Sequence, residues 1–135
     1  MEDYLHVVQY YETDKMGFVH HSNYVRWMEE ARINFLNNLG YEYVELEKEN
    51  ILSIIVSISC RYKHFTTFGD TVSIKVEVEE IQNFRFKLKY TMKNQDGTLV
   101  FEGFSEQVFT NSNNKLLLIK KEFPEFYETL SNLIK

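Results

Sequence analysis

Cysteine, proline and glycine are scarce in this sequence of 135 residues, and each scarcity excludes a class of structure. Cys60 is the only cysteine, so the chain can form no internal disulfide and no cysteine-rich metal site. With one proline and five glycines, no stretch has the composition of an interdomain linker. We therefore expect a single domain over residues 1–135, with Cys60 a buried and unreactive thiol in a β-rich stretch.

Long apolar runs and an excess of positive charge are missing as well. No run approaches the roughly 20 apolar residues that cross a bilayer, and residues 1–4 lack the basic start of a secretion signal. We therefore expect a cytoplasmic protein without integral membrane association. The formal net charge of −5 argues against a nucleic-acid partner, which needs a broad basic surface, but it allows a small polyanion held by a few local cations.

Aromatic residues, in contrast, are plentiful, with eleven Phe, nine Tyr and one Trp. Much of this volume can fill a core, and surplus aromatic surface would suit contacts between subunits. The hydrophobic fraction of 44% is ordinary for a globular protein, so the composition gives no reason to expect disorder.

The spacing of apolar residues predicts one long helix near the start of the chain. Residues 4–10 contain β-forming side chains and predict a first strand, and residues 12–17 form a polar turn. Over residues 22–39, apolar side chains then recur at helical intervals of three and four. Ser22 or Asn23 can cap this helix, and Gly40 can supply the left-handed residue that commonly ends one.

The rest of the chain is mostly β. Residues 41–50 are ambiguous and could hold one short helical turn, and strands are expected within residues 51–65, 72–79, 86–93 and 98–110. Asp96 and Gly97 predict a hairpin between the last two, residues 116–119 could add a short strand, and residues 123–133 predict a final helix with Pro124 in its first turn. We therefore predict an α+β domain in which an antiparallel sheet covers one central helix.

The segment between the first strand and the long helix contains the greatest concentration of reactive side chains. It places Asp14, His20 and His21 just before the helix starts. A helix start presents unpaired N–H groups and about half a positive charge, which can stabilise the negative oxygen that forms when a carbonyl is attacked. A nearby carboxylate could attack that carbonyl or activate water, so the pattern indicates acyl chemistry centred on Asp14.

Simpler interpretations of the same segment stay open. An aspartate shortly before a glycine, such as Asp14 before Gly17, is often only a turn residue, and His20 and His21 could be ordinary loop residues. We expect no metal site, because two adjacent histidines rarely point at one ion and no third ligand is evident. Glycine-rich phosphate loops, His-Glu-x-x-His and Gly-x-Ser-x-Gly motifs are absent.

Two groups of residues follow the pattern of a known family. The matching residues are Tyr10, Thr13, Asp14, Gly17, Val19, His21, Asn23, Tyr24, Arg26, Glu29, Ala31 and Arg32, and later Thr67, Phe68, Gly69 and Asp70. With these residues and its order of elements, the chain resembles the 4-hydroxybenzoyl-CoA thioesterase family, especially its bacterial acyl-CoA thioesterase branch associated with the Tol-Pal system. It departs from that pattern at Lys15 and Met16, where small residues are common, and at Thr66 or Thr67, which replaces a frequent proline.

The resemblance implies a hotdog fold, in which an antiparallel sheet wraps one long helix, and it implies dimers or tetramers with active sites between subunits. The expected reaction is hydrolysis of an acyl-CoA, or of an acyl-carrier-protein thioester, to a free acid without a cofactor. Asp14 matches the catalytic carboxylate, which acts as nucleophile or general base. His21 matches the position whose backbone N–H polarises the thioester carbonyl, and Tyr10 matches a tyrosine of the same site.

Other residues are expected to bind substrate or to support the fold. Gly17, Asn23 and Tyr24 belong to the matched segment and are substrate-binding candidates. Arg61 and Lys63, with His64 beside them, are candidates for the CoA phosphates, although they could equally be a solvated strand end. Glu29 lies on the helix, where a related hotdog group carries its catalytic carboxylate, but we favour a structural ion pair with Arg32 or Arg26.

Two other functions compete with thioester hydrolysis. Hotdog hydratases pair an acidic residue with a histidine, as Asp14 and His21 could do, and would add water to an enoyl thioester. A non-catalytic acyl-CoA-binding protein would keep the fold but gain little from a carboxylate facing an anionic ligand.

Overall fold

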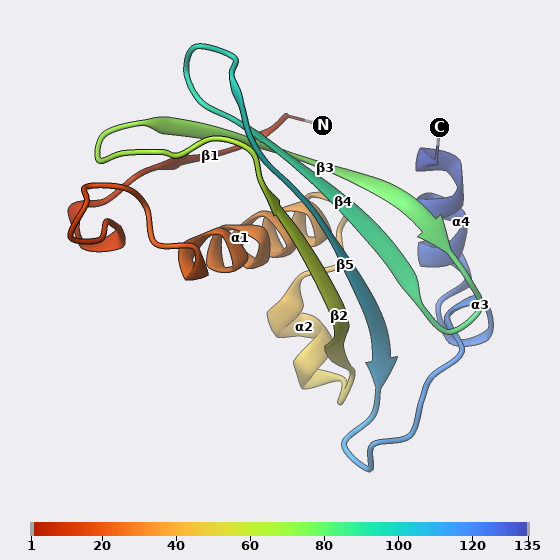
Figure 1. The fold of residues 1–135 in the computed structure, drawn as a ribbon. Helices are drawn as coiled ribbons and strands as arrows, with labels where there is room; N and C mark the ends of the chain where they lie inside the picture. The colour runs from red at the N-terminus through yellow and green to blue at the C-terminus, as the bar shows by residue number, and fades with distance from the viewer. Residues whose placement is uncertain (1, 135) are drawn as a thin grey trace.

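The computed structural model describes residues 2–134, with Tyr43 described by its backbone alone. Figure 1 shows a curled sheet with one long helix across its concave side. In chain order the elements are β1 (Tyr4–Val7), the 3-10 turn η1 (Tyr10–Glu12), α1 (Ser22–Asn38), α2 (Tyr43–Lys48), β2 (Leu52–Tyr62), β3 (Thr71–Ile81), β4 (Phe86–Lys93), β5 (Leu99–Thr110), α3 (Ile119–Glu122) and α4 (Pro124–Leu133).

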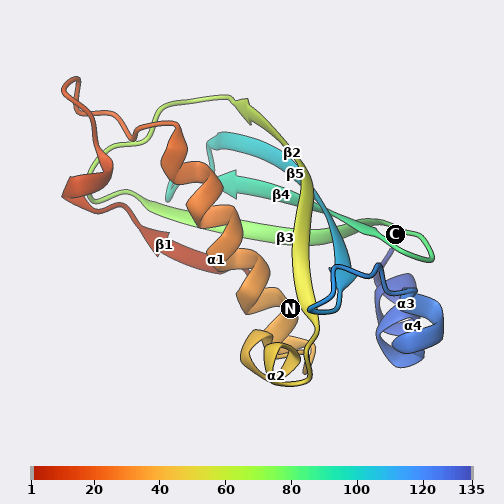
Figure 2. The same cartoon turned by 90° about the horizontal axis from the view of Figure 1, so that it is seen from below.

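The five strands form one antiparallel sheet in the order β1-β3-β4-β5-β2. The view from below in Figure 2 shows α1 crossing this sheet, with α3 and α4 at the far end. In β4 every second side chain is buried while its lysines lie on the other face, which is the period-two pattern of a half-buried strand. The sheet therefore offers one continuous apolar face to the helix.

The core lies between that face and α1. Trp27, Ala31 and Leu36 of the helix have no exposed surface, and Leu88 and Phe101 of the sheet are equally buried. Burial of each large apolar side chain contributes roughly 1.5–3 kcal/mol, so this layer is the main source of stability. It also fixes where the start of α1 lies relative to the sheet.

The two ends of α1 differ from each other. At its end Gly40 adopts φ +89°, and the Tyr41 N–H donates to the Leu36 carbonyl over 2.9 Å, as expected for a left-handed glycine end. At its start the prediction of a Ser22 or Asn23 cap is wrong. His21 occupies the capping position without a side-chain bond. The Ser22 hydroxyl instead bonds to His20 Nδ1 over 2.8 Å, and the Asn23 amide points inward and donates to the Glu12 carbonyl over 2.9 Å.

Three further predictions need correction. The first strand ends at Val7 because the chain turns into η1, and residues 116–119 form only one bridge, between Thr110 and Leu116, before α3 begins at Ile119. Cys60 is partly rather than fully buried, since β2 is an edge strand and its neighbour in β5, Gly103, has no side chain to cover it. The ambiguous residues 41–50 do contain a helix, α2.

Within the described residues, no helix is both long and apolar enough to cross a membrane. Glu29 lies 3.9 Å from the buried Arg32, so the predicted structural pairing on α1 is confirmed.

Candidate active site

A tight turn holds Asp14 just before α1. The Asp14 N–H donates to the Phe18 carbonyl over 2.7 Å, and the Gly17 N–H donates back to the Asp14 carbonyl over 3.0 Å. Gly17 has φ +85°, a left-handed conformation that side chains disfavour, so a glycine suits this position. Thr13 and Val19 pair across the base of the turn, which returns the chain toward the helix.

The Asp14 carboxylate is exposed but not free to rotate. Its Oδ1 accepts hydrogen bonds from the N–H groups of Met16 at 2.9 Å and Phe18 at 3.2 Å. No described residue bonds to Oδ2. Oδ1 of Asp14 therefore acts as an ordinary turn acceptor, as the simpler interpretation predicted. Oδ2 stays available for a bound molecule.

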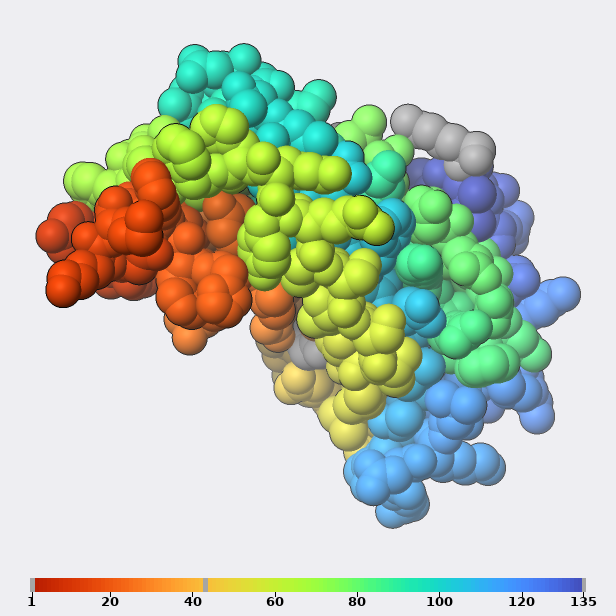
Figure 3. Space-filling view, in the orientation of Figure 1, coloured from red at the N-terminus to blue at the C-terminus, as the bar shows by residue number. Residues whose placement is uncertain are grey.

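Asp14 borders a cleft of about 500 Å³ between this turn, the start of α1 and the end of β2. In Figure 3 the orange start of α1 and the yellow-green segment at the end of β2 lie on the same face of the molecule. The cleft is lined by Asp14, Phe18, Val19, His20, His21, Tyr24, Tyr62, Lys63, His64 and Phe65. A carboxylate, several possible cations and an aromatic wall thus face one space.

Aromatic contacts join the end of β2 to the start of α1. The Tyr62 hydroxyl donates to the His21 carbonyl over 3.3 Å, and the Phe18 and Phe65 rings pack 4.3 Å apart. The Tyr24 hydroxyl bonds to Thr66 over 2.7 Å, and burial raises the pKa of Tyr24 so that it stays neutral. The His21 N–H at the helix start has no acceptor among residues 2–134.

The residues predicted for the site fall into two groups. Asp14, His21, Tyr24 and Lys63 all line the cleft. The other four predicted residues do not line the cleft. Tyr10 is 76% exposed and packs edge-on against Phe68. Gly17 lies in the turn, Asn23 is buried beneath the turn, and Arg61 is exposed on β2.

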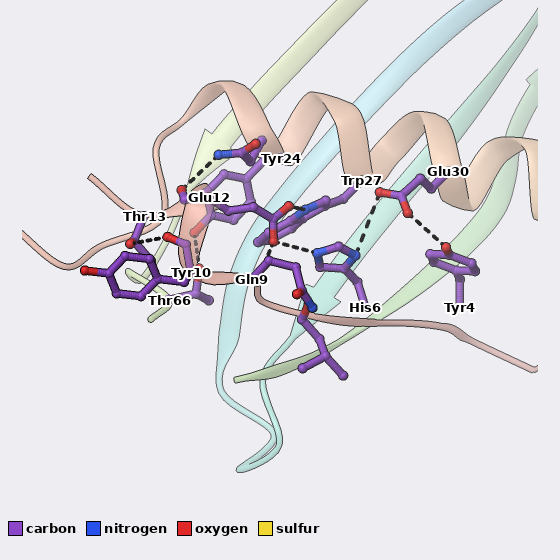
Figure 4. Close-up of polar contacts among 12 residues, drawn as sticks. Tyr4, His6, Gln9, Tyr10, Glu12, Thr13, Tyr24, Trp27, Glu30 and Thr66 are labelled. Atoms are coloured by element: carbon purple, nitrogen blue, oxygen red, sulfur yellow. Dashed lines mark hydrogen bonds and ion pairs between the residues drawn. The ribbon is translucent and has the colours of Figure 1, made fainter. Parts of the chain in front are cut away.

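A buried network next to the cleft was missed by the sequence reasoning. Figure 4 shows the Glu12 carboxylate between β1, η1 and α1. It accepts hydrogen bonds from the Gln9 N–H at 2.8 Å, from His6 Nε2 at 2.8 Å and from Trp27 Nε1 at 2.7 Å. No sequence spacing marks these residues as partners, because they come from three different elements.

The network extends outward and shifts the pKa of Glu12. His6 also lies 3.8 Å from Glu30, whose carboxylate accepts a hydrogen bond from the Tyr4 hydroxyl at 3.0 Å. Burial raises the pKa of the Glu12 carboxyl, but the hydrogen bonds from Gln9, His6 and Trp27 lower it more. The net pKa therefore lies below its ordinary value of 4.5, and Glu12 is ionised at neutral pH.

The described part of the chain contains no cluster of three or more His, Cys, Asp or Glu residues that could hold a metal ion. His20 and His21 stack on each other with ring centroids 4.2 Å apart.

Comparisons with known proteins identify the family. A model of the thioesterase-like superfamily matches residues 8–131, so the chain belongs to that superfamily. YneP of Bacillus subtilis, provisionally named an acyl-CoA thioesterase, is 32% identical over 121 residues, which cover 89% of this chain and 88% of YneP. A solved DHNA-CoA thioesterase from Staphylococcus aureus has a TM-score of 0.92 at 30% identity, covering 97% of this chain and 89% of that one.

A solved gentisyl-coenzyme A thioesterase is also similar, with a TM-score of 0.81 at 31% identity over 86% of this chain and 94% of that one. Together with the curled antiparallel sheet around α1, these matches confirm the predicted α+β hotdog fold. They also support the predicted class of enzyme, a thioester hydrolase.

Proposed function

We propose that this chain hydrolyses acyl-CoA thioesters to a free acid and CoA, with Asp14 as the nucleophile or general base. One observation carries the proposal: Asp14 shares a cleft with the start of α1, where the His21 N–H has no protein acceptor among the described residues. The family and its thioesterase members support the reaction. The roles given to Asp14 and His21 are those that the family resemblance implies, and the cleft that both residues line supports them.

The thioester carbonyl would dock with its oxygen toward the His21 N–H. The partial positive charge at the start of α1 and this N–H group would stabilise the oxyanion that forms on attack, an effect typically worth about 10²–10³ in rate. The carbon–sulfur bond then breaks, and the sulfur leaves as the thiolate of CoA and takes up a proton. Water supplies the oxygen of the free acid.

Asp14 can serve in either of two ways. Its Oδ2 could remove a proton from the attacking water, or it could attack the carbonyl itself and form a mixed anhydride that water then hydrolyses. Single-turnover hydrolysis in ¹⁸O-water separates these routes, because only the anhydride route places a solvent oxygen in the Asp14 carboxylate.

The other predicted residues take supporting roles in this proposal. Lys63 lines the cleft and is the better placed cation for a CoA phosphate, whereas Arg61 would have to reach in from the strand surface. Tyr24 forms a wall, and Gly17 and Asn23 shape the turn above it. Tyr10, on the exposed side of the turn, could contact a substrate only at the outer edge of the cleft.

We further propose a homo-oligomer in which β2 strands of two copies pair. In the five-stranded sheet β2 bonds only to β5, and its free edge carries Ile54, Val56 and Ile58 with 41%, 51% and 42% of their surface exposed. An unpaired edge with apolar side chains is readily covered by a second sheet edge. Pairing would also bring a second copy close to the cleft, which is lined by Tyr62 at the end of the same strand.

Several finer assignments stay predictions. They are membership of the 4-hydroxybenzoyl-CoA thioesterase family and its Tol-Pal-associated branch, a single domain over residues 1–135, a cytoplasmic location, the absence of a cofactor and of a nucleic-acid partner, and the choice between CoA and acyl-carrier-protein substrates.

The decisive experiment presents the purified protein with a panel of acyl-CoAs while released thiol is measured. Asp14→Asn should lower kcat by about 10²-fold or more. The asparagine Oδ1 can still accept the N–H groups of Met16 and Phe18, so the turn should persist. The matched control is Asp96→Asn in the exposed β4–β5 hairpin, which should keep wild-type activity.

Three outcomes would contradict the proposal. Equal turnover by Asp14→Asn and wild type would exclude the role of Asp14. Loss of enoyl absorbance without thiol release would indicate a hydratase. Tight CoA binding with no turnover across all chain lengths would indicate a non-catalytic binding protein.

A further inference from the structure

We propose that Glu12 is a positioning residue, which fixes the turn carrying Asp14 against the start of α1. This inference deepens the proposed function and rests on it for the catalytic role of Asp14. Glu12 does not line the cleft, so it acts through the turn and not on a substrate. It stands two residues before Asp14, where any movement of its main chain is passed directly to the turn.

The Glu12 side chain ties three elements together. Its Oε1 accepts from the His6 ring of β1 and from the Gln9 N–H at the start of η1, both at 2.8 Å. Its Oε2 accepts from the Trp27 indole of α1 at 2.7 Å. Trp27 is fully buried and Glu12 is 5% exposed, so the carboxylate cannot move without leaving N–H groups unpaired inside the protein.

The Glu12 main chain forms a second connection to the helix start. Its carbonyl oxygen accepts both the Asn23 side-chain amide and the His20 N–H, each at 2.9 Å. His20 follows the Asp14 turn and Asn23 lies in the first turn of α1. The residue before the turn and the residues after it are therefore held to each other at Glu12.

This arrangement explains how an exposed turn can place a carboxylate reproducibly. Asp14 itself makes hydrogen bonds only within its own turn, to residues 16, 17 and 18, so these bonds do not fix the turn relative to α1. The Glu12 bonds supply a direct constraint between the start of the turn and α1, while the far side of the turn is held by the Val19 N–H, which donates to the Thr66 carbonyl over 2.9 Å. A displacement of about 1 Å at a reacting group can lower a rate about 10²-fold, which is the scale of effect that the constraint should control.

The test replaces Glu12 by the isosteric Gln. A glutamine presents an NH₂ group toward N–H donors in place of one carboxylate oxygen, so one of the three bonds becomes a clash of two donors. We expect kcat to fall about 10- to 100-fold with KM changed less than about threefold, because the cleft lining stays intact. Glu45→Gln, at a surface ion pair of α2, is the matched control and should leave both constants unchanged.

A second readout does not depend on activity. The Met16 and Phe18 amides donate to Asp14, so their hydrogen exchange, measured by NMR, reports the turn itself. In Glu12→Gln these two amides should exchange about tenfold faster, while amides of β4 and β5 keep their wild-type protection. If Glu12→Gln does not fold, Trp27→Phe removes one donor while keeping an aromatic ring, and it should show the same pattern more weakly.

Unchanged exchange at Met16 and Phe18, or unchanged kcat with faster exchange, would overturn the positioning role. Faster exchange in β4 and β5 as well would also overturn it, because Glu12 would then only stabilise the whole fold. If the wild-type protein hydrolyses no acyl-CoA, the proposed function fails, and the exchange data still decide whether Glu12 holds the turn.

Discussion

Glu12 and Tyr90 are buried ionisable residues whose surroundings should make stability depend on pH at opposite ends of the scale. Glu12 is held as a carboxylate by three N–H donors, whereas Tyr90 is held as a neutral phenol in a polar cluster of the sheet. In both cases the folded protein favours one protonation state more than the unfolded chain does. Each residue therefore predicts the direction in which the free energy of unfolding changes with pH.

Glu12 should stabilise the protein above its ordinary pKa and lose that contribution in acid. Because the folded state lowers this pKa below 4.5, the contribution is complete above pH 4.5 and declines as pH falls through the folded pKa. In Glu12→Gln the stability should be lower at pH 7 and should vary less between pH 5 and pH 3. Urea unfolding of both proteins across this range measures the difference, and parallel pH curves would contradict it.

Tyr90 should have the opposite effect in alkali. Burial raises its pKa from 10.0 to about 12, although the Ser105 hydroxyl, 2.7 Å away, partly offsets this. The neutral phenol therefore contributes fully below pH 10, and its contribution is lost as pH rises from 10 to 12, by roughly 2–3 kcal/mol. Tyr90→Phe should flatten this alkaline decline in denaturation experiments. A decline as steep as that of the wild type would show that other groups cause it.

At the scale of elements, α1 is the part that connects the core to the cleft. Its middle is buried against the sheet, its start borders the cleft, and its end is closed by Gly40. Because these three regions have separate contacts, a change at the end of the helix should affect stability without affecting the site.

Gly40→Ala tests this separation. A Cβ at this position would meet no atom within 4 Å, so its effect is conformational and not steric. Holding alanine at φ +89° should destabilise the protein by about 1–2 kcal/mol while kcat stays at the wild-type value. Thermal unfolding and the thiol-release assay measure the two quantities. An equally large loss of kcat would mean that the two ends of α1 are coupled.

At the scale of the whole molecule, the longer of the two unpaired sheet edges is the free edge of β2, the other being the four-residue β1. It is bordered by the cleft at one end and carries apolar side chains along its length. If two copies pair along this edge, the sheet becomes continuous and two clefts face the same interface.

Val56→Lys should therefore weaken self-association. A charge at the centre of this edge would be buried without a partner on pairing, which is unfavourable. Light scattering at micromolar concentration should show a dimer or tetramer for the wild type and a shift toward monomer for Val56→Lys. Val44→Lys on α2, at a position with 62% of its surface exposed, is the matched control. A monomeric wild type, or an unchanged mass for Val56→Lys, would contradict the proposed interface.

The sequence by itself determined the elements that depend on local pattern. The extent of α1 and the alternating strands follow from periodic burial, because one face of each element meets the core. The end of α1 follows from Gly40, which adopts the left-handed conformation easily. Asp14 could also be singled out, because its turn and the following helix start are adjacent in the chain. These features involve residues only a few positions apart.

Only the tertiary structure decided the features that join distant residues. The Glu12 network brings together residues 6, 12 and 27, and the cleft is lined by Tyr62 at the end of β2 and by Lys63 just after it. Cys60 is left partly exposed by its position on an edge strand. The strand predicted at residues 116–119 is likewise absent from the sheet: Leu116 forms one bridge, and α3 begins at Ile119. The physical reason is that pairing between elements depends on the order of strands in the sheet, which no local periodicity encodes.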